Sequence, residues 1–208
     1  MGGWIRALLL GALLVCGLAT TASAQAPSQA QRVQAREIYQ RVIAFDTSVE
    51  GAQTPAMAEY LAGLFRGAGF PAEDVHVLPL NGTAGLVVRY RGNGSGGRPI
   101  VLLAHMDVVP ALRSDWERDP FTLVEENNFF FGRGTIDNKG GVVQLTSTFL
   151  TLRSEGFVPT RDLIIWFSGD EETSGATTEA LLAQHRELLG EAEFALNSDA
   201  GGGQLDAH

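Results

Sequence analysis

Three short and largely apolar segments do most to limit what this chain can fold into. The run Ile100–Ala104 is apolar throughout, and residues 162–167 and 194–197 form two further strand-like runs. Uninterrupted apolar runs are typical of strands that are covered on both faces of a sheet. Segments with apolar residues at helical spacing lie between and around these runs. The sequence therefore predicts an α/β domain with helices on both faces of a sheet.

Periodicity and turn residues place the remaining elements. A long irregular stretch is expected through Trp116 and Pro120. The glycine-rich run Gly92–Gly97 fits the spacing of a dinucleotide-binding loop, but a strand rather than a helix follows it, so we interpret it as a connection between strands. The predicted helices span residues 33–45, 57–65, 138–154 and 177–189, and the predicted strands span residues 75–80, 85–90, 99–104, 162–167 and 194–197.

The N-terminus has the order of a secretory signal peptide. Arg6 precedes an apolar stretch over residues 7–18, and small residues follow up to Ala24. This order predicts cleavage after Ala24 and a secreted or periplasmic protein. An uncleaved membrane anchor is the alternative, but the apolar stretch is shorter than the roughly 20 residues that a spanning helix needs. Lipid attachment at Cys16 is less favoured, because Val15 precedes it where a small residue is usual. We expect no stable membrane insertion after cleavage.

The remaining sequence is acidic and rich enough in apolar residues to form a core. Residues 25–32 are predicted to be a linker, and residues 33–208 a folded domain. The chain has 15 Lys and Arg residues against 24 Asp and Glu residues, and its hydrophobic fraction is 45%. A negative surface repels phosphate backbones, so nucleic acid is excluded as an expected partner.

Polar residues that a core would not tolerate follow each of the three apolar runs. His105 and Asp107 follow the first run, Asp170–Glu172 follow the second, and Asp199 follows the third. Ligands of α/β sheets bind beyond the carboxyl ends of the strands. We therefore expect these side chains to converge on one site.

Each of these groups has a simpler interpretation when it is taken alone. His105 and Asp107 suit an ordinary hydrogen-bonded pair, although a carboxylate at that spacing also orients metal-bound histidines. Asp137 suits a helix N-cap, although its flanking glycines also allow close approach to a ligand. Asp170–Glu172 suit a solvated loop, but adjacent carboxylates behind so apolar a strand favour a bound cation. Together with Asp199, a metal site is the better interpretation.

These residues match an ordered set of motifs that covers nearly all of the chain after the linker. On these motifs the chain resembles the aminoacylase and glutamate carboxypeptidase family of dizinc metallopeptidases, which includes acetylornithine deacetylase and succinyl-diaminopimelate desuccinylase. The resemblance implies a zinc-exopeptidase-like sheet. The motifs are His105–Pro110, Trp116, Asp119–Phe121, Gly132–Gly134 with Asp137, Lys139–Gly140, Asp170–Glu172 and Asp199.

The resemblance also implies roles for individual residues and two Zn²⁺ ions as cofactors. His105 and Asp199 would bind one zinc, Glu172 would bind the other, and Asp137 would bridge them. Glu171 would be the general base, and Asp107 would orient His105. The peptide bond between Asp137 and Asn138 would be cis. Imidazole and carboxylate ligands suit Zn²⁺, and a paired site activates water while it polarises a carbonyl.

The implied function is hydrolysis of an amide or peptide bond in a small peptide or an N-acyl amino acid, of the carboxypeptidase, dipeptidase or aminoacylase type. Family members have a further histidine ligand near the end of a longer chain, and a second, smaller lid or dimerisation domain. No motif before His208 corresponds to these, so we expect the sequence to be the N-terminal part of such a catalytic domain, with any homodimer formed through the second domain. A catalytically silent metal-binding or interaction domain is the alternative.

Overall fold

The computed structural model describes residues 26–199. The predicted signal peptide and His208 therefore lie outside the described residues. Within residues 26–199, none of the helices combines the length and the apolar character that crossing a bilayer requires.

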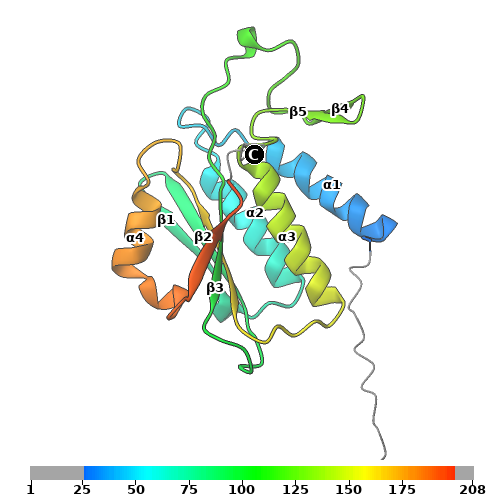
Figure 1. Ribbon diagram of the computed structural model, residues 1–208. Helices are drawn as coiled ribbons and strands as arrows, with labels where there is room; N and C mark the ends of the chain where they lie inside the picture. The colour runs from blue at the N-terminus through cyan, green and yellow to red at the C-terminus, as the bar shows by residue number, and fades with distance from the viewer. Residues whose placement is uncertain (1–25, 200–208) are drawn as a thin grey trace, which may run out of the picture.

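A five-stranded sheet with the order β1-β2-β6-β3-β7 is the centre of the described part of the chain (Figure 1). β3 pairs in parallel with β6 and with β7, whereas β2 is antiparallel to both of its neighbours. The three apolar runs therefore lie next to one another and point the same way. The strands are β1 (Val75–Leu80), β2 (Thr83–Tyr90), β3 (Ile100–His105), β6 (Leu163–Ser168) and β7 (Phe194–Asn197).

Helices cover both faces of this sheet, as predicted. The helices are α1 (Gln29–Ile43), α2 (Thr54–Gly67), α3 (Lys139–Ser154) and α4 (Ala176–Gln184). α2 and α3 cover one face with α1 packed beside α3, and α4 covers the other face (Figure 1). A large core with Phe65, Phe149 and Phe167 fills the first layer. A smaller core with Trp166 and Leu181 lies under α4. The α/β prediction is confirmed.

All four helices differ from their predicted bounds, and α1 and α4 differ most. α1 begins at Gln29, because Ser28 accepts from the Gln31 backbone N–H while the Gln31 side chain accepts from the Ser28 N–H. Residues 29–32 of the predicted linker are thus helical. α4 ends at Gln184, and a 3-10 helix (Arg186–Leu189) follows it, so the predicted helix over 177–189 is interrupted. The glycine-rich run joins β2 to β3 and is followed by a strand, as expected.

A small hairpin occupies part of the stretch that was predicted to be irregular. Its strands, β4 (Val124–Glu126) and β5 (Phe129–Phe131), are joined by Asn127 and Asn128, both at positive φ. Asparagine tolerates this conformation, which suits a tight hairpin turn. Tyr39 of α1 packs edge-on against Phe130 with ring centroids 5.3 Å apart. The prediction was wrong here because strands this short show no clear alternation.

Candidate metal centre

The parallel strands bring the predicted polar residues to one edge of the sheet. His105 at the end of β3 is in register with Ser168 at the end of β6, and Leu103 is in register with Asn197 of β7. The residues that follow these strands therefore emerge side by side. The predicted convergence of the strand ends is confirmed.

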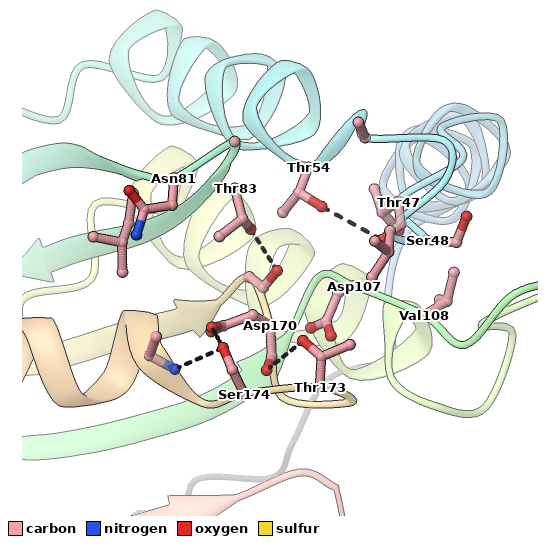
Figure 2. A pocket seen from close by; sticks show the side chains of 16 residues that line it. Thr47, Ser48, Thr54, Asn81, Thr83, Asp107, Val108, Asp170, Thr173 and Ser174 are labelled. Carbon is pink, nitrogen blue, oxygen red and sulfur yellow. Dashed lines mark hydrogen bonds between the residues drawn. The ribbon is translucent and has the colours of Figure 1, made fainter.

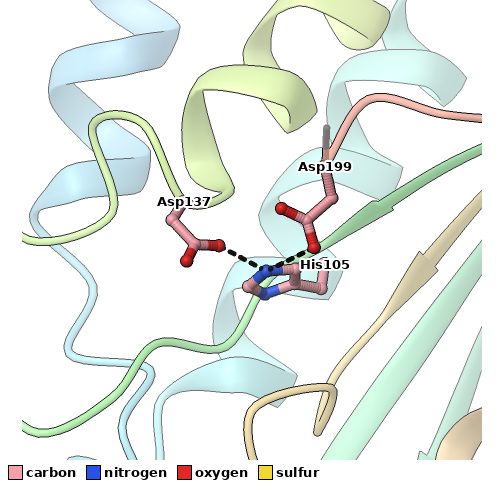
Figure 3. Close-up of side chains that lie close together, drawn as sticks. All are labelled: His105, Asp137 and Asp199. Carbon is pink, nitrogen blue, oxygen red and sulfur yellow. Dashed lines mark hydrogen bonds and ion pairs between the residues drawn. The ribbon is translucent and has the colours of Figure 1, made fainter. Parts of the chain in front are cut away.

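His105, Asp137 and Asp199 form a cluster whose ligand atoms all lie within 4.8 Å of one another. Nε2 of His105 lies 2.8 Å from Oδ1 of Asp137 and 3.6 Å from Oδ2 of Asp199. Figure 3 shows both carboxylates directed at this nitrogen from opposite sides, Asp137 from the segment before α3 and Asp199 from the segment after β7. The His105 side chain is buried, whereas Asp137 is open to solvent. One nitrogen and two carboxylates thus face a common point.

Asp107 supports this cluster from behind. Its backbone carbonyl accepts a hydrogen bond from His105 Nδ1 at 3.0 Å, and its carboxylate lies 3.4 Å from the same nitrogen. The carboxylate also accepts from the backbone N–H groups of Glu171 at 3.1 Å and of Glu172 at 2.9 Å. Asp107 therefore directs Nε2 of His105 toward the other ligands, and it fixes the position of the two glutamates as well.

The two glutamates face the cluster from the end of β6. Oε2 of Glu171 lies 4.0 Å from Nε2 of His105, and its side chain is 52% exposed. The pKa of Glu172 is raised, mainly by partial burial and then by the negative charge of Asp137. The neighbouring carboxylates of Glu171 and Asp107 add to this rise. A cation among them would relieve this repulsion.

The protonation of His105 depends on the same carboxylates. Burial by itself lowers the pKa of His105, but the hydrogen bonds and negative charges of Asp107 and Asp137 outweigh it and raise the pKa to about 9. In the absence of metal this imidazole is therefore a cation at neutral pH, held by the carboxylates that surround it. The site attracts positive charge at the position of Nε2.

Asp170 does not belong to the metal-facing group, although it is the first acid of the Asp170–Glu172 run. It is 6% exposed and accepts from Ser174 Oγ at 2.6 Å, from Thr177 N at 3.0 Å and from Thr177 Oγ1. Burial raises the pKa of this carboxyl, but these hydrogen bonds outweigh that effect and lower it. Asp170 fixes the turn between β6 and α4 instead of facing a cation.

Sequence reasoning placed Lys139 only within a motif and assigned no task to it. The structure buries Lys139 completely, and its Nζ donates to the Phe45 carbonyl at 2.6 Å. Burial lowers its pKa to about 7. Lys139 lies two residues after Asp137, so this hydrogen bond ties the segment that carries the Asp137 carboxylate to the residues that follow α1. The peptide bond between Asp137 and Asn138 is cis, as the resemblance implied.

The donor set fits a zinc ion. A single imidazole nitrogen, fixed in its tautomer by a carbonyl acceptor, lies among carboxylate oxygens, which is the combination that zinc takes in hydrolases. Within residues 26–199 this is the one group of three or more such side chains close enough to hold a metal. Glu172 is not part of that group.

Comparisons with known proteins give one consistent result. A sequence profile described as Peptidase family M20/M25/M40 matches residues 101–205. The N-fatty-acyl-amino acid synthase/hydrolase PM20D1 of Bos taurus is 32% identical over 186 residues, which cover 82% of this chain and 37% of that protein. Acetylornithine deacetylase of Erwinia tasmaniensis is 33% identical over 145 residues, which cover 67% of this chain and 37% of the enzyme.

Solved structures show the same fold. Human carnosine dipeptidase 1 matches with a TM-score of 0.69 and 20% identity, over 83% of this chain and 40% of that one. An M20 family metallo-carboxypeptidase from Sulfolobus solfataricus matches with a TM-score of 0.70 and 20% identity, over 81% of this chain and 38% of that one. The chain thus spans less than half the length of these relatives.

Proposed function

Because the chain belongs to the peptidase M20/M25/M40 family, we propose that it carries most of the active site of a zinc-dependent hydrolase. Its substrates are small peptides or N-acyl amino acids. The names of its relatives support this range, since they include a hydrolase of N-fatty-acyl amino acids, a deacetylase and a dipeptidase. The observation that carries the proposal is the cluster of His105, Asp137 and Asp199 with Glu171 beside it.

In this proposal His105 and Asp199 would hold one zinc, Glu172 would hold a second, and Asp137 would serve both. When it is bound, zinc polarises the scissile carbonyl and lowers the pKa of a water molecule. Asp107 holds His105 in the tautomer that leaves Nε2 free to act as a ligand. The same carboxylate accepts from the backbone N–H groups of Glu171 and Glu172, so the positions of both glutamates are fixed relative to His105.

Glu171 acts as the general base. Its carboxylate is half-exposed and lies 4.0 Å from the His105 nitrogen, where it can meet a water molecule and a substrate from solvent. It accepts a proton from the attacking water and returns that proton to the leaving nitrogen. A residue with this task needs access to the reacting atoms, and it does not need to bind the metal.

Elemental analysis and a substrate panel test the proposal. We expect the purified chain to hold about one tightly bound zinc, because three donors meet only at His105 among the described residues. His105→Ala should remove this zinc, and His185→Ala, outside the cluster, should leave it. Turnover of dipeptides and N-acetyl amino acids should require zinc and should be small in this chain. Bound zinc without turnover in any preparation would instead favour the silent metal-binding domain.

The two glutamates give a sharper test in any preparation with measurable turnover. Glu171→Ala should abolish hydrolysis and leave the zinc content nearly unchanged, because a general base is not a ligand. Glu172→Ala should lower zinc occupancy, which elemental analysis measures. The opposite pattern would show that the roles within the pair are exchanged.

A further inference from the structure

The two sides of the metal cluster are held in place by different contacts. On the side of β6, Asp107 accepts hydrogen bonds from the backbone of both glutamates, and Figure 2 shows it beside the turn that follows β6. On the other side, Asp137 precedes α3 and Asp199 follows β7 (Figure 3). These two segments belong to different elements, so a contact between them is needed to fix the separation of the two aspartates.

The residues next to the two aspartates provide this contact. Ser198 precedes Asp199, and Asn138 follows Asp137. Oγ of Ser198 lies 3.4 Å from Oδ1 of Asn138. The two side chains therefore meet one residue away from each carboxylate, and they join the segment before α3 to the segment after β7.

Ser198 also ties these segments to the strand that carries His105. Its backbone N–H and its Oγ both donate to the Leu103 carbonyl, at 3.0 Å and 2.9 Å. Leu103 lies in β3, two residues before His105. A hydroxyl has one proton, so the bond to Leu103 is the main bond of Ser198 and the contact with Asn138 is the weaker one. Ser198 thus touches the segments that carry all three residues of the cluster.

Asn138 departs from the usual behaviour of a residue at its position. It is the N-cap of α3, where an asparagine side chain normally accepts a hydrogen bond from a backbone N–H of the first turn. Within residues 26–199 its side chain makes no such bond. Its Oδ1 instead contacts Ser198, and the residue is buried. A capping residue whose side chain leaves the cap unused indicates a different purpose for that side chain.

Gly141 leaves the space that this contact requires. It lies in the first turn of α3, three residues after Asn138. A Cβ added at this position would overlap with Oδ1 of Asn138 and with Oγ of Ser198. Any side chain here would therefore push both residues away. Glycine is otherwise less favourable than alanine in a helix, because it loses more conformational entropy on folding.

We propose that Asn138, Gly141 and Ser198 form a clasp that sets the separation of the two aspartates of the metal cluster. The members of the clasp are positioning residues, because they act through the aspartates and not on the substrate. Binding groups must be held to within about 0.5 Å, so a small displacement of either segment weakens the site. The proposal rests on the proposed function for the identity of the bound ion as zinc.

Two variants test the clasp, and each has a matched control. Gly141→Ala inserts the methyl group that the clasp excludes, whereas Gly63→Ala adds the same group to α2 where residues 26–199 leave open space. Ser198→Ala removes the hydroxyl of the clasp, whereas Ser154→Ala removes a hydroxyl that donates to a backbone carbonyl at the end of α3. Urea denaturation of the zinc-free chains establishes that each variant folds.

Zinc affinity, measured by competition with a chelator, is the first readout. We expect both clasp variants to bind zinc about tenfold or more weakly than the native chain, which is the usual loss when a residue that supports a metal ligand is changed. The two controls should keep the native affinity. Native affinity in either clasp variant, or an equal loss in its control, would overturn the proposal.

NMR of the His105 ring in the zinc-free chain is the second readout, and it needs no metal. Nε2 of His105 lies 2.8 Å from Oδ1 of Asp137, so the signal of its N–H reports the position of that carboxylate. The clasp variants should shift this signal, and the controls should leave it in place. Absence of zinc uptake by the native chain would count against the proposed function alone. An unshifted His105 signal in the clasp variants would overturn the clasp.

Discussion

The affinity for zinc should depend steeply on pH, because His105 must lose a proton before Nε2 can bind a metal. Burial lowers the pKa of this histidine, but Asp107 and Asp137 outweigh burial and raise the pKa to about 9. Below that pH the proton competes with zinc for the same nitrogen. Each pH unit below about 9 should therefore weaken the apparent affinity about tenfold.

The magnitude follows from the distance between the pKa and the working pH. Between pH 9 and pH 7 the expected loss is about 100-fold, or about 2.7 kcal/mol. An ordinary histidine, with a pKa of 6.5, would lose almost nothing over this range. The zinc-free fold should show the opposite dependence. Because the folded pKa is raised, its stabilisation is complete below pH 6.5 and is lost as the pH rises through about 9.

Competition against a chromophoric chelator at fixed pH values measures the affinity and keeps free zinc low. Calorimetry in two buffers with different ionisation enthalpies counts the protons released, and about one should be released at pH 7. Asp107→Asn removes one of the charges that raise the pKa of His105, so the dependence on pH should become shallower. His185→Gln is the matched control and should reproduce the native curve. An affinity that changes less than about threefold between pH 7 and pH 9 would refute this reasoning.

Two further outcomes are expected from the turn after β6 and from the N-terminus. Asp170→Ala should lower the free energy of unfolding by about 3 kcal/mol, because buried donors lose their acceptor. Urea denaturation measures this loss, and Asp115→Ala, at an exposed position, is the control. Equal effects of the two substitutions would contradict the structural role of Asp170. In an exporting host, N-terminal sequencing should find the mature chain starting after Ala24; an intact N-terminus in the membrane fraction would support the anchor instead.

The part of the site at His105, Asp107 and Asp199 could be predicted because an apolar strand reveals where it ends. The short apolar runs before these residues correspond to β3 and β7. These two strands are parallel, so they end at the same edge of the sheet. The chemistry of the side chains then suggests a metal. Their roles stay predictions until zinc is measured.

The direction of Asp170 could not be predicted from three adjacent acids. The sequence does not show which of the three carboxylates is buried. Asp170 is buried because the backbone N–H and the hydroxyl of Thr177 donate hydrogen bonds to it. The complete burial of Lys139 was also hidden, since a lysine has no local signal for an acceptor as distant as the Phe45 carbonyl. The capping residues Ser28 and Gln31, in contrast, were visible in the sequence and would have given the start of α1.

The strand order has a consequence for the time at which the site forms during folding. β1 and β2 are neighbours in the sequence, whereas β3 reaches β6 and β7 only across the whole of α3 and α4. Contacts between distant segments form slowly because long loops must close first. We expect the metal ligands to meet only after these parallel pairs have formed, late in folding. Zinc should therefore slow unfolding much more than it speeds refolding. Stopped-flow kinetics would reject this order if zinc accelerated refolding as strongly as it slowed unfolding.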